Sequence, residues 1–123
     1  MNCLKSARKF FAACYAHLDC SKETLWIAHL DGSRRCVHLA RHSGDETTVP
    51  FPLKSILRDA ITFESVAILL AHNHPSGDAK PSMADIAVTR QLATVCSALG
   101  CAILDHLVFG SDGCCSLRSL GLL

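Results

Sequence analysis

Two histidines, a serine and an aspartate fall within one short stretch of the sequence, and together they could bind a metal ion and use it. His72 and His74 are separated by one residue and directly follow the apolar run of residues 66–71. In extended backbone, alternate residues point to the same face, so both imidazoles can reach a single ion. Asp85 could supply a third ligand, which leaves the fourth position of a tetrahedral ion open for water. That arrangement is typical of catalytic rather than structural zinc.

The helix predicted from Ser82 to about Leu99 gives a reason for a cation near Asp85. Ser82 is a good N-cap, and Asp85 falls at the N3 position. The stripe of this helix that is expected to face the core consists of Val88, Leu92, Val95 and Leu99. Asp85 precedes Val88 by about one helical turn, so a carboxylate is the first residue of the core-facing stripe. An unpaired charge there would cost several kcal/mol, and a divalent ion would neutralise it.

Metal-assisted hydrolysis is the chemistry that such a site favours. A bound ion makes its water more acidic and polarises a carbonyl group, and Ser82 at the helix start could donate a hydrogen bond to a developing oxyanion. Each part also has a purely structural interpretation. An HxH pair alone is weak evidence, and the spacing of Ser82 and Asp85 is also that of a capping box. Their combination across a proline-bounded loop favours the metal site.

The remaining pattern predicts an α/β domain that places this loop at the end of a buried strand. Residues 65–71 are apolar almost throughout, which predicts a central strand buried on both faces. The other expected elements are a helix over 3–18, strands over 24–30 and 35–41 joined by a hairpin turn at Asp31-Gly32, a helix that starts at Pro52, a strand over 101–110 and a short final strand over 114–117. Strands that alternate with helices indicate a sheet packed by helices. We expect one domain over residues 21–123, preceded by an amphipathic helix within residues 1–20.

The composition is that of a globular protein with no overall preference for nucleic acid or membrane. The chain has 123 residues, of which 50% are hydrophobic and 19% are charged, and its formal net charge is +1. No apolar run approaches the ~20 residues of a membrane-spanning helix, and charges interrupt the apolar part of the N-terminus, unlike a signal peptide. The eight cysteines form no CxxC pair. We therefore expect reduced thiols in a cytoplasmic protein without a membrane partner.

The spacing of the polar residues resembles a known motif. His72-x-His74, seven residues, Ser82, two residues and Asp85 match the JAMM motif of MPN-domain metalloproteases. The longer string LLAHNHPSGDAKPSMAD, with DHLVFG at 105–110, resembles the bacterial RadC family, and the likeness spans residues 20–123. The resemblance implies a cytidine-deaminase-like fold, a single three-layer α/β domain with a mixed central sheet flanked by helices.

The same resemblance implies a function. It implies one zinc ion per chain, held by His72, His74 and Asp85, with Ser82 as the transition-state stabiliser in the cleavage of peptide or isopeptide bonds. RadC proteins also carry a DNA-repair name. Members usually have an N-terminal segment similar to a helix-hairpin-helix, of which this sequence contains one helix.

The sequence departs from the family pattern at one catalytic position. The pattern includes a glutamate on an upstream strand, which acts as general base towards the zinc-bound water. Counting back from the histidines places it near Leu39 or Ala40, and neither residue is acidic. Glu46, beyond the following turn, is the replacement that we consider first. The weaker candidates are Glu23 and Glu64, which look like solvated residues at strand entries, and His38 and His42, which flank the expected position and could relay protons.

Asp105 and His106 form another polar pair, inside an apolar strand. As a feature of the family, the pair could form hydrogen bonds to the metal ligands and orient them. The alternative is a locally hydrogen-bonded pair at a strand edge.

Three functions stay open at this point. The first is a zinc-dependent hydrolase that acts on an amide bond in a peptide or protein substrate. The second is a catalytically degenerate MPN domain that keeps the metal for structure and serves as a binding or scaffold module, as the absent glutamate suggests. The third is a DNA-repair accessory, which the near-neutral charge does not support. The substrate, the oligomeric state and the source of the missing base are not determined by the sequence.

Overall fold

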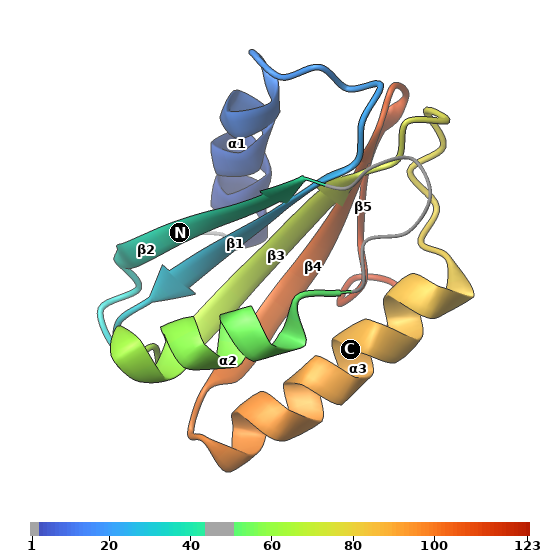
Figure 1. Ribbon diagram of the computed structural model, residues 1–123. Coiled ribbons are helices and arrows are strands. Elements are labelled where there is room, and N and C mark those ends of the chain that lie inside the picture. Colours follow the sequence, from blue (N-terminus) through green and yellow to red (C-terminus); the bar gives the residue numbers. More distant parts are fainter. Residues whose placement is uncertain (1–2, 44–50) are drawn as a thin grey trace.

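The computed structural model describes residues 3–43 and 51–123, which form a five-stranded sheet with helices on both faces (Figure 1). In chain order the elements are α1 (Cys3–Tyr15), β1 (Thr24–Leu30), β2 (Cys36–Ser43), α2 (Leu53–Thr62), β3 (Ala67–Asn73), α3 (Met83–Ala98), β4 (Ala102–Gly110) and β5 (Gly113–Ser116). The strands lie in the order β2-β1-β3-β4-β5. β3 and β4 are parallel and are connected through α3, whereas the other neighbouring pairs are antiparallel, so the sheet is mixed.

The sheet separates two hydrophobic cores, which makes the domain three-layered. On one face, α1 packs Ala7 and Phe11 against β1, β3 and β4. On the other face, α2 and α3 cover a core that includes Ile56 and Leu92. Figure 1 shows α1 on the far side of the sheet and the other two helices in front of it. This arrangement confirms the predicted three-layer α/β fold. Within the described part of the chain, no helix is long and apolar enough to cross a membrane.

β3 occupies the centre of the sheet because it is apolar on both faces. Ile68 and Leu70 belong to the core under α2 and α3, and Ala67 and Ala71 belong to the core under α1. Burial on both faces is typical of an inner strand of an α/β sheet. The strand continues through His72, which pairs with both neighbouring strands. The first histidine is therefore held by the sheet itself.

The connection in the first hairpin is longer than the predicted two-residue turn at Asp31-Gly32. The carboxylate of Asp31 accepts hydrogen bonds from the backbone N–H groups of Ser33 at 2.8 Å and Arg35 at 3.0 Å. The left-handed backbone falls on Arg34, with a φ of 65°, and not on Gly32. Because an aspartate can stabilise a longer turn through its own side chain, the Asp-Gly pair does not determine the length of the connection.

Helix α3 buries a different stripe from the predicted one. Its buried residues are Thr89, Leu92 and Cys96, whereas Leu99 is 46% exposed. Leu92 lies in the core as predicted, but Val88 and Val95 are half-buried and the prediction for Leu99 was wrong. Apolar residues occupy more than one side of this helix, so their spacing permits either stripe. Asp85 heads the observed stripe as well, since it lies one turn before Thr89.

The loop between β3 and α3 packs closely against the end of β4. The His74 N–H donates to the Phe109 carbonyl at 2.8 Å, and the Ser111 N–H donates to the Gly77 carbonyl at 2.9 Å. Gly110 lies between these contacts, and a Cβ at this position would stand 2.2 Å from the carbonyl oxygen of Gly77. The missing side chain of Gly110 therefore allows the loop that carries His74 to lie against the sheet.

We expect Gly110→Ala to destabilise the domain, because the added methyl group must displace the backbone of the loop. Overpacking of this kind costs about 1–3 kcal/mol, so the melting temperature should fall measurably in differential scanning calorimetry. Gly32→Ala is the matched control, because a Cβ at Gly32 would have no atom within 4 Å. Equal melting temperatures for the two variants would contradict the close packing at Gly110.

Candidate metal centre

The three predicted metal ligands meet where the carboxyl ends of β3 and β4 approach the amino end of α3. His72 lies in β3, His74 directly follows that strand, and Asp85 is in the first turn of α3. In open α/β sheets, ligands commonly bind beyond the carboxyl ends of the parallel strands. The loop between β3 and α3 thus folds three residues of one sequence stretch into a single cluster.

One atom from each of these residues forms a compact triangle. His72 Nε2 lies 2.9 Å from His74 Nε2, and Asp85 Oδ2 lies 3.3 Å from the former and 3.1 Å from the latter. A tetrahedral zinc ion, at about 2.0–2.1 Å from each nitrogen or oxygen, separates its ligands by roughly 3.3–3.4 Å. The triangle is slightly tighter than this, so a small outward movement of the side chains would accommodate an ion.

When its ring is neutral, His74 presents an unprotonated nitrogen to the triangle. Its Nδ1 lies 2.8 Å from the carbonyl oxygen of Asp78, and a carbonyl only accepts hydrogen bonds, so Nδ1 carries the proton. Nε2 of the neutral ring then directs a lone pair towards the carboxylate of Asp85, which is also an acceptor. Two acceptors at this distance repel unless a cation or a proton lies between them. The set of donor atoms therefore fits a divalent ion.

Asp85 is kept in its charged form at the start of α3. Its Oδ2 accepts from the Ser82 N–H at 2.8 Å, and Ser82 Oγ accepts from the Asp85 N–H at 3.0 Å. These two bonds confirm the predicted capping box. Burial raises the pKa of Asp85, but the neighbouring His72 imidazole and the Ser82 hydrogen bonds outweigh burial and hold this pKa well below its usual range. The carboxylate is thus ionised and available to a cation at neutral pH.

Glu23, which the sequence analysis ranked among the weaker candidates because it looked like a solvated residue at a strand entry, lies beside the triangle. Its Oε1 lies 3.8 Å from His72 Nε2, and its side chain is 54% exposed. Glu23, His72 and His74 each contribute one atom to a group that lies within 4.8 Å. The signal that could have identified Glu23 is its place directly before β1, since β1 pairs with the strand that carries His72.

Asn73, between the two histidines, holds the segment that contains Glu23. Asn73 Oδ1 accepts from the Thr24 N–H at 2.7 Å, and Asn73 Nδ2 donates to the Lys22 carbonyl at 2.9 Å. The asparagine is 5% exposed, so these bonds are shielded from water. Because Asn73 binds the backbone on both sides of Glu23, it determines how the carboxylate approaches the histidines.

The position where the upstream glutamate was expected is separated from His72 by one strand. Leu39 and Ala40 are in β2, the edge strand, whereas β1 lies between β2 and β3 and places Leu25 beside His72. Spacing along the chain does not show which arm of the hairpin pairs with β3. Glu46 lies outside the described residues.

The other weaker candidates lie apart from the triangle. His38 stacks on Phe63 with ring centroids 4.1 Å apart, and its Nε2 lies 3.5 Å from a carboxylate oxygen of Asp59 in α2. His42 is in the edge strand β2, and Glu64 lies in the turn before β3, at the far end of that strand from the histidines. Among the described contacts, none links these candidates to the ligands.

Asp105 and His106 have different roles although they are adjacent in β4. His106 Nε2 lies 2.6 Å from His72 Nδ1, directly behind the metal-facing nitrogen. Asp105 instead accepts hydrogen bonds from the Ser116 hydroxyl and from the backbone N–H of Arg118. Only His106 of this pair contacts a candidate ligand, and Asp105 anchors the C-terminal turn.

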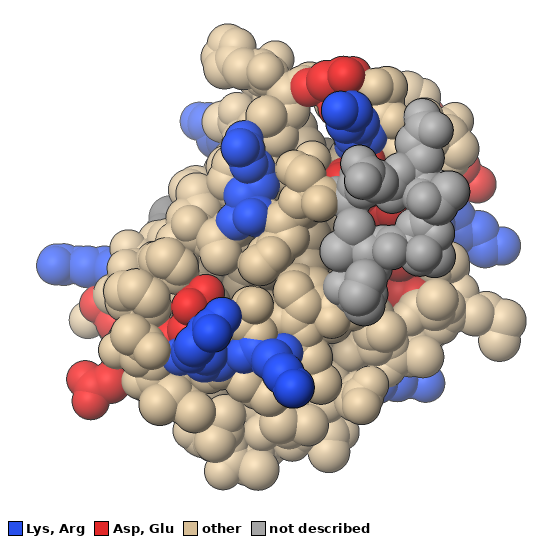
Figure 2. Space-filling model, viewed as in Figure 1, with Lys and Arg blue, Asp and Glu red and all other residues tan. Residues whose placement is uncertain are grey.

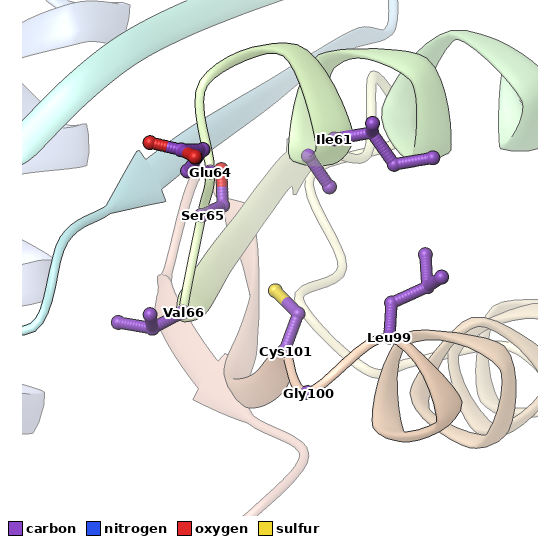
Figure 3. Close-up of a pocket in the computed structure, with 8 residues that line it drawn as sticks. Ile61, Glu64, Ser65, Val66, Leu99, Gly100 and Cys101 are labelled. Carbon is purple, nitrogen blue, oxygen red and sulfur yellow. The ribbon is translucent and has the colours of Figure 1, made fainter.

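A separate hollow of about 330 Å³ lies at the opposite end of the sheet, between the turn before β3 and the turn after α3 (Figure 3). Figure 3 shows Ile61, Val66 and Leu99 around it, so much of its lining is apolar. Glu64 and Ser65 are polar residues of the lining. The hollow is therefore distinct from the histidine cluster.

The fold and the cluster together define an α/β domain with a candidate metal centre of the JAB/MPN type. A family model described as RadC-like JAB domain matches residues 1–122, so the chain belongs to that family, as its sequence predicted. The chain is also similar to a UPF0758 protein of Coprothermobacter proteolyticus, with 38% identity over 92 residues. The match covers 74% of this chain and 39% of the relative, so the chain spans about two fifths of that protein's length.

We expect His106 to reduce the stability of the metal-free protein in acid. Burial lowers the pKa of His106 to about 3, whereas a histidine in an unfolded chain titrates near ~6.5. Between these values the unfolded state binds more protons, so the free energy of unfolding should fall as the pH decreases, by up to ~1.4 kcal/mol per pH unit.

The matched comparison is His106→Gln, because burial also lowers the pKa of His29 and this residue contributes in the same direction. Urea unfolding of both proteins between about pH 4.5 and 7 should show a shallower pH dependence for His106→Gln. Parallel stability curves would contradict the assignment of a neutral, buried His106.

Proposed function

We propose that this protein is a zinc-dependent hydrolase that cleaves an amide bond in a peptide or protein substrate. The observation that carries the proposal is the convergence of His72 Nε2, His74 Nε2 and Asp85 Oδ2 within 3.3 Å. Two imidazoles and one carboxylate are a ligand set that zinc takes in hydrolytic enzymes, with one position left for water. A bound zinc would make that water more acidic and polarise the substrate carbonyl.

Glu23 is the residue that we assign as general base. Its carboxylate lies beside the triangle and is open to solvent, where a substrate would enter. At that position Oε1 would accept a proton from the attacking water and later deliver it to the departing amide nitrogen. Asn73 supports this role, because its bonds to the neighbouring backbone limit the movement of Glu23. We therefore assign the upstream glutamate of the family pattern to Glu23 rather than to Glu46.

Ser82 is suited to stabilise the oxyanion. Its Oγ accepts from the Asp85 N–H, which leaves its own hydroxyl proton for another acceptor. Ser82 is exposed, and it caps the amino end of α3, where the helix dipole favours negative charge. A carbonyl oxygen that gains charge during attack would meet a hydrogen-bond donor and a positive helix end together.

The two alternative functions have less support. The case for a degenerate binding module was the absent glutamate, and that reason falls away with Glu23 as the proposed base. A DNA-binding role calls for clustered positive charge, whereas the net charge is +1 and the face in Figure 2 carries scattered Lys and Arg side chains among uncharged and acidic ones. The family name is therefore the argument that remains for a DNA-repair role.

Protein that is purified from zinc-containing medium should carry close to one zinc per chain in elemental analysis. His74→Ala removes a ligand, so its zinc content should fall to a small fraction of that value. His17→Ala, which changes an exposed histidine just after α1, is the control and should retain the metal. Equal zinc contents in His74→Ala and the unaltered protein would contradict the site.

Glu23→Gln should lower turnover by ~10²–10⁴-fold while zinc stays bound, because the variant keeps the ligands and loses the general base. Hydrolysis can be followed by mass spectrometry on a library of peptides and isopeptide-linked conjugates. The control is Glu64→Gln, which makes the same chemical change at the far end of β3 and should leave turnover unaltered. If Glu23→Gln and Glu64→Gln cleave equally fast, Glu23 is not the base.

A further inference from the structure

We propose that Thr89 and His106 are positioning residues that fix the tautomer of His72, so that His72 presents Nε2 to the metal without a proton. The inference rests on the proposed function, because it takes His72 Nε2 as a zinc ligand. Neither residue lies in the triangle itself, and both act through the far nitrogen of the His72 ring.

A continuous chain of hydrogen bonds runs from the backbone of α3 to His72. Thr89 Oγ1 lies 2.6 Å from the carbonyl oxygen of Asp85 and 2.7 Å from His106 Nδ1. His106 Nε2 in turn lies 2.6 Å from His72 Nδ1. Thr89 is fully buried, and His106 and His72 are 2% and 4% exposed. The chain is therefore shielded from water, and its groups have to satisfy one another.

The carbonyl of Asp85 sets the direction of every proton in this chain. A carbonyl oxygen only accepts, so the hydroxyl proton of Thr89 points to Asp85, and Thr89 Oγ1 accepts from His106. Nδ1 of His106 therefore carries the proton, and Nε2 of its neutral ring accepts from His72. His72 then holds its proton on Nδ1, which leaves a lone pair on Nε2 facing the triangle.

The opposite direction would disable the ligand. If Thr89 donated to His106, then His106 would donate through Nε2 to His72, and the His72 proton would sit on the metal-facing nitrogen. That arrangement would also leave the Thr89 oxygen and the Asp85 carbonyl, two acceptors 2.6 Å apart, without a proton between them. Because Thr89 lies one helical turn after Asp85, the helix itself favours the tautomer that can bind metal.

The burial of Thr89 and His106 also calls for a reason beyond packing. Thr89 lies on the buried stripe of α3 with Leu92, and His106 is aligned with Leu70 of β3. A polar group in such surroundings costs free energy unless its hydrogen-bonding capacity is used. Here the Thr89 hydroxyl both donates and accepts, and both ring nitrogens of His106 are engaged. The orientation of a metal-binding histidine is a role that uses all of these groups.

The direct test is long-range ¹H–¹⁵N correlation spectroscopy of the metal-free protein, which shows which ring nitrogen of each histidine carries a proton. We expect the Nδ1–H tautomer for both His106 and His72. An Nε2–H tautomer for either residue would overturn the proposal. This measurement needs no metal and no activity, so the predicted tautomers in a protein without zinc affinity would support the relay and overturn the proposed function.

A matched pair of variants tests the consequence for metal binding. Thr89→Val removes the oxygen with little change in volume and should weaken zinc binding by ~10–100-fold in competition with a chromophoric chelator. Thr89→Ser keeps the oxygen and should bind like the unaltered protein. Equal affinity in Thr89→Val and Thr89→Ser would overturn the proposal.

A second pair at His106 keeps the test valid if Thr89→Val does not fold. The side-chain oxygen of His106→Gln can accept from His72 while its NH₂ group donates to Thr89, so this variant should retain most of the zinc affinity. His106→Leu can form neither hydrogen bond, so its zinc affinity should fall to the extent expected for Thr89→Val. Equal losses in both His106 variants would overturn the relay.

Discussion

Three electron-rich atoms, His72 Nε2, His74 Nε2 and Asp85 Oδ2, meet within 3.3 Å at one corner of this domain. Such atoms repel one another unless a positive charge lies among them, and the surrounding structure holds them together. The sheet fixes the first histidine, the closely packed loop fixes the second, and the amino end of α3 fixes the carboxylate. The triangle therefore calls for a positive charge, which a bound metal ion would supply.

The polar groups around the triangle perform several tasks at once. The capping box that starts α3 also orients the Asp85 carboxylate and leaves the Ser82 hydroxyl proton at the mouth of the site. Asn73 closes the gap between β3 and the segment before β1, and thereby places Glu23 at the edge of the cluster. A small domain can support a reactive site in this way, because the same hydrogen bonds stabilise the fold and position the reacting groups.

Much of this organisation could be predicted from the sequence, where local chemistry determines the result. The apolar strand before His72, the cap at Ser82 and the HxH pair each have a local signature, and the structure contains the strand, the cap and the convergence of the histidines on Asp85. Glu23 was ranked too low and Thr89 was missed, for a different reason. Their positions depend on strand pairing and on the rotation of a helix with apolar residues on several sides, and neither property is encoded in a short stretch of residues.

The most direct measurement of the central claim is anomalous diffraction at the zinc absorption edge, on crystals of protein that was purified with its metal. We predict one strong peak at the triangle, within bonding distance of His72 Nε2, His74 Nε2 and Asp85 Oδ2. A well-ordered structure at this corner with no anomalous peak, or with its zinc bound elsewhere, would contradict it.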